Sequence, residues 1–517
     1  MEILDQYNIN FENTTIPITI YKDRNKDMNT IYEVGILSIG KYTNLIVEKI
    51  KEDLLREGIF DSSSSNFSYD SMKKSFISKV EQLIKFYFPN LKFEERENLI
   101  TYLVQKSLDL GFVDILISDS QIEELVINGA ESKVMVYHRK FGWLKTNLQF
   151  LSDDEIKNIS LRIALENKKF YSNLSPLLDA HLRGGHRVNA TLDAVSTKGS
   201  TMTIRRFSDK PWTVSDLVNS KTSSSTSLAL IWIAMENEMS IIIAGGTGSG
   251  KTSFLNAISS FIPMNQRILS VEDTREIRLP DYSHWVPMEA RQANQEGKGQ
   301  VSMLDLIVNT LRMRPDRILI GEIRKKQEAE VLFEAMRTGH SVYGTFHANT
   351  ASETVLRLSN APINIPKISL NALGLICIQH RDRKSGQRVT LQVAEMKDSG
   401  DENVVLQYNA KTKETEWKNK PESLLKRLEE FNGIDEKEFY HLIKEREFVL
   451  EYLARFNINS IDEVGQVIDK YYNEKDNLFK VIQRKNTLWK AQQEKIKEKE
   501  KQKQLLEQKR NPKHITN

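Results

Sequence analysis

The sequence predicts an α/β protein whose central element is a parallel β-sheet flanked by helices. Four short apolar runs typical of buried strands alternate with segments of helical periodicity, at residues 241–244, 268–271, 318–320 and 342–346. Such alternation along the chain is the usual signature of a parallel sheet. A glycine-rich segment follows the first run and carboxylic acids follow the second and third, so polar groups are expected at strand ends.

Length and composition favour a globular protein of several units. A chain of 517 residues is expected to form about three structural units. Hydrophobic residues make up 39% and charged residues 28%, which is enough apolar material for sizeable cores. The formal net charge is only +3, so the charge balance of the whole chain does not indicate binding to nucleic acid or lipid.

The single cysteine and the apolar runs bear on the cellular setting. Cys377 alone excludes an internal disulfide or a cysteine-built zinc site within one chain, and a reducing, cytoplasmic setting fits best. The apolar runs fall short of the roughly 20 residues that span a bilayer. The acidic, polar N-terminus does not resemble a signal peptide, so we expect membrane contact only through a partner.

Shifts in composition divide the chain into six segments. They are residues 1–75, a divergent N-terminal module; 76–212, an α+β domain; 213–228, a linker; 229–396, the α/β domain; 397–482, a hairpin and helical region; and 483–517, a basic tail. The linker is assigned because it is rich in serine and threonine. The tail is dominated by Lys, Gln and Glu and is expected to be helical or disordered.

The strongest local signal is GGTGSGKT at residues 245–252, which matches the phosphate-loop pattern G-x-x-x-x-G-K-[S/T] in full. Glycines let backbone N–H groups approach a polyphosphate closely, and the helix that begins here adds its N-terminal dipole. Lys251 would contact the β- and γ-phosphates and Thr252 would bind Mg²⁺. We therefore predict that ATP and Mg²⁺ bind at Gly245, Gly246, Thr247, Gly248, Ser249, Gly250, Lys251, Thr252 and Ser253.

Carboxylic acids follow two of the predicted strands. Glu272 and Asp273 come directly after the second apolar run, and Glu322 closely follows the third. Ligands of an open parallel sheet bind outside the carboxyl ends of its strands, so these acids are expected to face the phosphates and the metal. We expect Glu322 to polarise the attacking water, and the three acids with Thr252 are the candidate metal residues. The alternative is that the acids merely begin solvated loops.

Histidines flank the fourth predicted strand. His347 follows its carboxyl end, where an imidazole can sense a γ-phosphate, and His340 precedes it. A zinc site is less favoured, because the pair lies across a strand with no cysteine nearby. Either histidine could instead be structural.

Arginines near these elements can bridge two phosphate oxygens, and one supplied by another domain or subunit would couple hydrolysis to movement. Any single one could equally be a surface or ion-pair residue. The candidates are Arg187, Arg205, Arg275, Arg278, Arg291, Arg312, Arg314, Arg324 and Arg337.

The order of four motifs, GGTGSGKT, SVEDTREIRLP, LRMRPDRILIGEIR and TGHSVYGTFHANT, resembles the type II/type IV secretion ATPase superfamily. In that group the motifs are named Walker A, Asp box, Walker B and His box. Upstream, VYHRKFGWLKTN, PLLDAHLRGGHRVNATL and GSTMTIRRF are most similar to the archaeal branch, which drives archaellum rotation and type IV pilus assembly. The resemblance covers residues 100–396.

The resemblance implies a RecA-like P-loop NTPase domain with an N-terminal α+β (PAS-like) domain and a helical C-terminal extension. Arg187 in GGHRV and Arg205 in TIRRF fall where the family's N-terminal domain supplies arginines to the nucleotide. The other implied roles are Walker A for Lys251 and Thr252, the Asp box for Glu272 and Asp273, the Walker B carboxylate for Glu322, and the His box for His340 and His347.

The resemblance also implies partners. They are a homohexamer, a polytopic membrane platform protein and, indirectly, pilin-like subunits, with no direct contact to nucleic acid. The protein would be cytoplasmic and peripheral at the inner face of the membrane. The chain departs from many bacterial members in lacking a four-cysteine zinc module, and Arg183 stands where relatives often have proline.

Other functions remain open on the sequence. A nucleic-acid translocase with the same RecA-like core would need a basic stripe, and the tail at residues 483–510 is the one candidate. A degenerate, non-catalytic subunit is disfavoured because the catalytic positions are all present. A small-molecule kinase would leave the upstream domain and the Asp and His boxes without a role.

Overall fold

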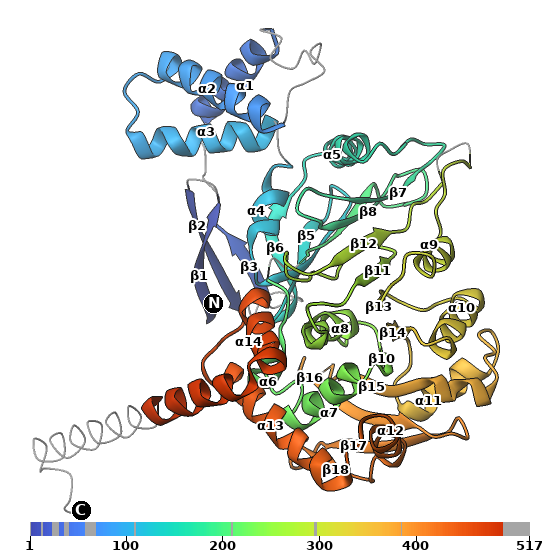
Figure 1. The fold of residues 1–517 in the computed structure, drawn as a ribbon. Helices are drawn as coiled ribbons and strands as arrows, with labels where there is room; N and C mark the ends of the chain where they lie inside the picture. Colours follow the sequence, from blue (N-terminus) through green and yellow to red (C-terminus); the bar gives the residue numbers. More distant parts are fainter. Residues whose placement is uncertain are drawn as a thin grey trace, which may run out of the picture. The chain divides into compact units, whose positions relative to one another are not determined.

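The computed structural model describes residues 2–11, 14–22, 30–35, 41–56, 69–107, 110–207, 210–293, 297–383 and 385–489. The chain divides into two compact units, Met1–Asp209 and Lys210–Asn517 (Figure 1). Within the described residues each unit holds one nine-stranded sheet.

The sheet of the N-terminal unit has the order β1-β2-β3-β6-β5-β4-β9-β8-β7. Its pairs are antiparallel except for β3 and β6, which are parallel. Alternate residues of its strands are buried, because successive side chains of a strand point to opposite faces. The strands are β1 (Glu2–Phe11), β2 (Thr14–Lys22), β3 (Thr30–Val34), β4 (Ile122–Asn128), β5 (Lys133–His138), β6 (Gly142–Gln149), β7 (Leu177–His181), β8 (Arg187–Thr191) and β9 (Thr201–Arg205).

Helices α4 (Phe112–Ser118) and α5 (Asp153–Glu166) add buried side chains to the core of this sheet. The predicted α+β architecture is therefore confirmed. The predicted separate module at residues 1–75 is not seen as such, because β3 pairs with β6 and brings β1–β3 into the same sheet.

Three further helices of the N-terminal unit form a small core of their own. It is built from the apolar faces of α1 (Lys41–Arg56), α2 (Tyr69–Tyr87) and α3 (Phe93–Ser107). Val47, Phe76 and Leu103 lie at its centre with no exposed surface. The predicted boundary near residue 75 therefore falls inside α2, because helix packing rather than composition sets this cluster.

The sheet of the C-terminal unit has the order β12-β11-β13-β14-β10-β15-β16-β17-β18. Strands β10 to β15 pair with one another in parallel, and β16 to β18 continue the sheet from β15 as antiparallel strands. The strands are β10 (Ser240–Gly245), β11 (Ile268–Glu272), β12 (Trp285–Glu289), β13 (Arg317–Ile320), β14 (Ser341–Phe346), β15 (Leu373–Arg381), β16 (Arg388–Met396), β17 (Glu402–Asn409) and β18 (Glu414–Trp417). This arrangement, with the strand before the glycine loop at the centre, confirms the predicted RecA-like fold.

Helices cover both faces of this sheet, so its parallel strands are buried on either side apart from the edge strand β12, which is partly exposed (Figure 1). One face packs on α6 (Val214–Asn219), α7 (Ser225–Glu236), α8 (Lys251–Ile258), α12 (Glu422–Asn432), α13 (Glu436–Arg455) and α14 (Ile461–Asn473). The other packs on α9 (Met303–Thr310), α10 (Lys326–Arg337) and α11 (Ala351–Ser359), and the short 3-10 helices are Ser259–Phe261 and Lys367–Ala372.

Residues 213–228, predicted as a linker, form α6 and the start of α7. Their hydroxyl side chains cap these helices: Thr213 and Asp216 make a capping box, and Ser224 accepts from the Ser227 N–H. Val214 and Leu217 are buried in the core. The boundary between the compact units lies at residues 209 and 210 instead.

Residues 397–482 also belong to the core of the C-terminal unit. The predicted hairpin is present as β17 and β18, and it extends the main sheet. The buried carboxylate of Glu395 in β16 accepts hydrogen bonds from the Asn403 side chain and the Leu424 N–H, and so joins β16, β17 and α12. Of the predicted basic tail, residues 483–489 are helical and the rest lies outside the described residues.

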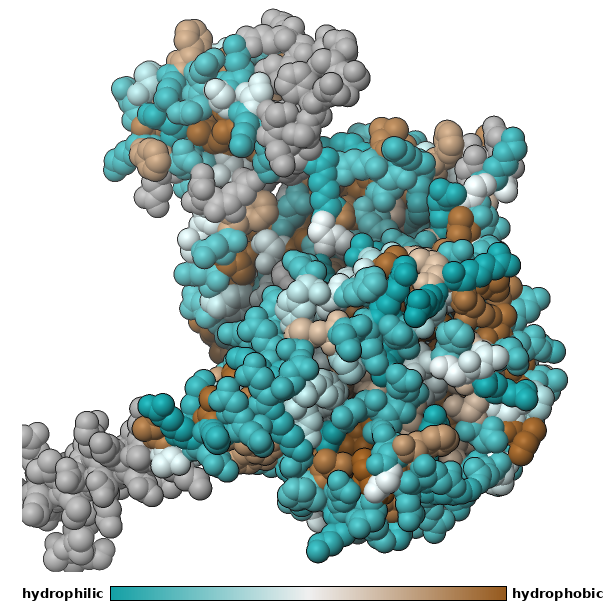
Figure 2. Space-filling model, in the orientation of Figure 1, coloured by the Kyte–Doolittle hydropathy of each residue, from teal (hydrophilic) through white to brown (hydrophobic). Residues whose placement is uncertain are grey.

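The view in Figure 2 is mainly hydrophilic, with hydrophobic residues in scattered areas. The described part of the chain contains no helix that combines the length and the apolar character needed to cross a bilayer.

Candidate functional site

The glycine loop lies between β10 and α8, at the carboxyl end of the central strand. Gly248 and Gly250 have φ angles of +72° and +87°, a region that disfavours residues with a side chain. A Cβ at Gly245 would lie 2.4 Å from the backbone oxygen of Gln379, so only glycine fits there. These constraints shape a loop whose backbone can approach a polyphosphate closely.

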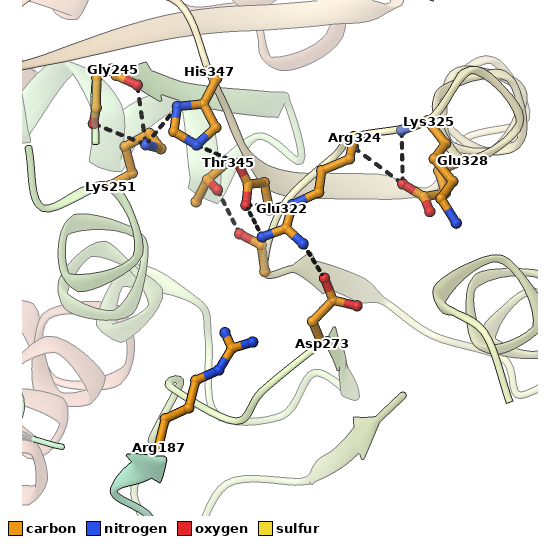
Figure 3. A network of polar contacts seen from close by, with 12 residues as sticks. Arg187, Gly245, Lys251, Asp273, Glu322, Arg324, Lys325, Glu328, Thr345 and His347 are labelled. Carbon is orange, nitrogen blue, oxygen red and sulfur yellow. Dashed lines mark hydrogen bonds and ion pairs between the residues drawn. The ribbon is translucent and has the colours of Figure 1, made fainter. Parts of the chain in front are cut away.

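Lys251 begins α8 and folds its side chain back over the loop. Its ammonium donates to the backbone oxygens of Gly245 and Gly246, both at 3.1 Å, and the residue is only 9% exposed. The same nitrogen lies 3.5 Å from Nδ1 of His347 (Figure 3). A positive charge is therefore held within the loop by two carbonyl groups and faces the residue that follows β14.

His347 connects Lys251 to Glu322. Its Nε2 lies 2.7 Å from Oε1 of Glu322, which follows the neighbouring strand β13. Partial burial lowers the pKa of His347, and the nearby charge of Lys251 lowers it further. The ring is then neutral at neutral pH. The two ring nitrogens thus face an ammonium on one side and a carboxylate on the other, and among the described residues Oε1 of Glu322 has no partner with hydrogen-bond geometry.

Arg324 joins Glu322 to Asp273. Its Nε and NH2 lie 2.8 and 2.6 Å from Oε2 of Glu322, and its NH1 lies 2.6 Å from Oδ2 of Asp273 (Figure 3). Asp273 follows β11 and Glu322 follows β13, and these strands are neighbours in the sheet. One guanidinium thus bridges the acids at two adjacent strand ends.

Glu272 lies apart from this chain of contacts. It is 1% exposed, and its Oε1 accepts the N–H groups of Glu276 and Ile277, while Oε2 is buried without a hydrogen-bond partner. Burial raises the pKa of its carboxyl group to about 7. Its side chain packs close beneath Gly321, where a Cβ would lie 3.2 Å from Cγ of Glu272.

The predicted residues are only partly brought together. Lys251, His347, Glu322 and Asp273 meet, with Arg324 completing the network. His340 does not join them: it precedes β14, which runs parallel to β10, and so lies at the opposite edge of the sheet from the glycine loop. There its Nδ1 lies 3.4 Å from the hydroxyl of Thr338. The expected pairing of the two histidines at one site is therefore not seen.

Arg187 and Arg205 belong to the N-terminal unit. They occupy directly opposite positions of β8 and β9, so both project from the same face of that sheet. Arg187 makes a two-point contact with Asp179, its Nε and NH2 lying 3.1 and 3.0 Å from the carboxylate oxygens. The pair places two guanidinium groups on one face of the sheet, beside the carboxylates of Asp179 and Glu124.

Two arginines that were not predicted lie against the glycine loop. Arg381 of β15 and Arg388 of β16 are directly paired across the strands. Arg388 Nε donates to the backbone oxygen of Gly248 at 3.1 Å, and NH1 of Arg381 lies 3.1 Å from where a Cβ of Gly248 would be. The turn residues of DRKSGQR between two apolar strands were the available signal for this hairpin.

The residues fit a nucleotide with a divalent cation better than a metal held by protein alone. The described residues contain no group of three His, Cys, Asp or Glu side chains able to hold a metal. Thr252 stands in the first turn of α8, beside a loop suited to phosphate, and Lys251 and His347 connect that loop to Glu322, which Arg324 joins to Asp273. The unpartnered Oε2 of Glu272 is a further oxygen near these strand ends. In P-loop proteins the phosphates complete such a coordination shell.

Comparison with known proteins agrees with these features. Residues 107–504, more than half of the chain, match the family described as type II/IV secretion system protein. An uncharacterised protein of Methanocaldococcus jannaschii is 36% identical over 350 residues, which cover 65% of this chain and 46% of that protein. The type IV secretion system protein PtlH of Bordetella pertussis is 28% identical over 286 residues, 51% of this chain and 79% of PtlH.

The chain spans about half the length of the first curated relatives that it matches. Among solved structures, the ATPase DotB of Legionella pneumophila is 19% identical with a TM-score of 0.41, covering 69% of this chain and 95% of DotB.

Proposed function

The chain belongs to the type II/IV secretion system protein family, and from this premise we propose that it is an ATP-hydrolysing motor subunit of a secretion or filament-assembly machine. The match of residues 107–504 to this family confirms the resemblance that the four motifs indicated. The proposal is carried above all by the continuous contact from Lys251 through His347 to Glu322, which connects the glycine loop to an acid at the next strand but one.

The proposed chemistry follows from this contact. The loop N–H groups and Lys251 would bind the phosphates, with Lys251 exchanging its two carbonyl partners for phosphate oxygens. Glu322 would orient and polarise the attacking water, while His347 fixes the carboxylate and stands close to the γ-phosphate position. Thr252, Asp273 and Glu322 would hold Mg²⁺ with the phosphates, directly or through water. When bound, Mg²⁺ would neutralise charge that develops on the phosphates.

We further propose that Arg187 and Arg205 contact the nucleotide and transmit its state to the N-terminal unit. Both lie on one face of the sheet, and Arg187 would exchange its two-point contact with Asp179 for phosphate oxygens. The motor would act as a homohexamer beneath a polytopic membrane platform protein and drive pilin-like subunits of a pilus or archaellum. It would lie in the cytoplasm, held at the membrane by these partners.

The test is hydrolysis by the purified full chain with and without Mg²⁺, together with its mass in each nucleotide state. We expect phosphate release that needs Mg²⁺, and a hexamer favoured by ATP. Lys251→Ala should abolish nucleotide binding and turnover, and a variant that hydrolyses ATP as the parent does would overturn the proposal. Hydrolysis that is stimulated by duplex or single-stranded DNA and not by anionic vesicles would instead indicate a nucleic-acid translocase.

A further inference from the structure

We propose that Arg324 is a built-in counter-ion that competes with the divalent cation for Glu322 and Asp273. The guanidinium contacts one oxygen of each carboxylate at 2.6 Å, so it lies between the two acids (Figure 3). These acids come from different strands and have no other described bridge between them. Arg324 therefore does between β11 and β13 what a bound cation would do.

The backbone of Arg324 is fixed, so only its side chain can leave. The carboxylate of Glu328 accepts the N–H groups of Arg324 and Lys325, both at 3.1 Å, and caps α10. Ile323, the preceding residue, is buried and donates its N–H to the backbone oxygen of Thr345 at 2.9 Å. The Arg324 side chain, in contrast, is 57% exposed. Its rotation breaks the bridge without disturbing the strand or the helix.

Because of their positive charges, the Arg324 side chain and a divalent cation are expected to exclude each other at Glu322 and Asp273. With Arg324 in place, each carboxylate already contacts a positive group, and a divalent cation beside them would meet repulsion from the guanidinium. A nucleotide brings additional negative charge to the glycine loop and favours the cation over the arginine. This inference rests on the proposed function, since it concerns the cation that accompanies the nucleotide. It makes Arg324 a positioning residue that couples cation entry to nucleotide binding.

The experiment measures binding of Mn²⁺ to the nucleotide-free full chain by electron paramagnetic resonance. We expect Arg324→Gln to bind Mn²⁺ about tenfold more tightly than the parent, because the competing charge is gone. Arg324→Lys keeps the positive charge, so its affinity for Mn²⁺ should stay near that of the parent. Lys326→Gln is the matched control: it removes a neighbouring charge on the same segment, where Lys326 pairs at 3.6 Å with Glu330 of the same helix.

Asp273→Asn in the Arg324→Gln background removes one of the two carboxylates and should reverse the gain. Binding by Arg324→Gln that is no tighter than in the parent would overturn the proposal. So would an equal gain in Lys326→Gln, which would indicate a general charge effect. The Mn²⁺ measurement needs no turnover, so a negative result leaves the proposed hydrolysis standing, and an inactive parent chain leaves the role of Arg324 open to the same measurement.

Discussion

Nε2 of His347 lies 2.7 Å from Oε1 of Glu322, and the opposite ring nitrogen faces Lys251. A neutral imidazole is suited to this place, because one nitrogen accepts and the other donates. A shift of Lys251 on binding phosphate would therefore move the His347 ring and, with it, the position of the Glu322 carboxylate. This relationship makes His347 the most informative residue to change first.

His347→Ala should lower the turnover number by about 100-fold while nucleotide affinity changes less than about threefold. The ring positions the carboxylate but is not the main phosphate ligand, so the loss falls on the chemical step. His347→Gln offers an amide that can donate to Glu322 and should recover part of the rate. Single-turnover phosphate release and binding of a fluorescent ATP analogue separate the two effects. A large loss of affinity with an unchanged rate would contradict this role.

Glu322→Gln should keep nucleotide binding and lose hydrolysis by at least about 100-fold. The amide cannot act as a base, although it preserves the shape of the side chain. The measurement is multiple-turnover phosphate release beside the dissociation constant of the nucleotide. Glu330→Gln, an exposed acid on α10, is the matched control and should behave as the parent. Normal turnover in Glu322→Gln would remove this carboxylate from the mechanism.

Glu272 should make stability depend on pH. Burial raises the pKa of its carboxyl group from 4.5 to about 7, so the charged form is disfavoured in the folded chain. The folded state therefore holds the proton more tightly, and its stabilising contribution is complete below pH 4.5 and lost as pH rises through about 7. At higher pH the cost is at most roughly 3 kcal/mol.

Glu272→Gln, which stays neutral and can still accept from Ile277 and Glu276, should flatten this dependence. Thermal unfolding measured at about pH 5 and at about pH 8, on either side of the shifted pKa, tests this expectation. Relative to the parent, Glu272→Gln should be more stable at the higher pH and no more stable at the lower pH. An advantage that is equal at both ends would show that Glu272 is charged in the folded chain.

Much of the site follows from local sequence rules. The glycine loop and the positions of Glu322, Asp273 and His347 depend only on a pattern and on the rule that parallel strands present their carboxyl ends at one edge. The same rule, applied strictly, excludes His340, because it precedes the strand. Arg324 was one of several arginines in the sequence, and its bridge depends on the spacing of β11 and β13, which no local pattern specifies.

The parts that sequence did not predict depend on distant contacts. Serine and threonine at residues 213–228 suit a linker and helix caps equally well. They cap helices here because Val214 and Leu217 are buried in the core, which holds this segment as a helix. Pairing of β3 with β6 joins residues more than 100 positions apart, so composition does not reveal it. The C-terminal helices likewise join the core through α13 and α7, which are far apart in the chain.

Arg388→Ala should raise the dissociation constant of the nucleotide by about threefold to tenfold. The change removes the hydrogen bond from Nε to the backbone oxygen of Gly248, so the loop loses a contact that holds its shape. Arg383→Ala, in the exposed turn of the same hairpin, is the control for charge. Titration with a fluorescent nucleotide provides the measurement. Equal weakening in both variants would indicate long-range attraction rather than support of the loop.

Helix α14 contacts the segment that follows Glu272. Tyr282 donates its hydroxyl to the backbone oxygen of Asp462 at 3.1 Å, and a Cβ at Gly465 would lie 2.2 Å from that hydroxyl. In an isolated helix, Gly→Ala stabilises by about 1 kcal/mol. The clashing atom is the end of the Tyr282 side chain, which is 44% exposed and must turn away and lose its hydrogen bond to Asp462, so Gly465→Ala is expected to destabilise the docking of α14 by at most about 1 kcal/mol.

Amide hydrogen exchange across α14 measures this docking directly, and faster exchange is expected in Gly465→Ala. Tyr282→Ala removes the side chain that the new methyl group would meet. The double variant should therefore lose less than the two single changes added together, since the clash is absent while the helical preference of alanine remains. Slower exchange in Gly465→Ala alone would mean that helix propensity dominates and that the contact with Tyr282 does not hold α14.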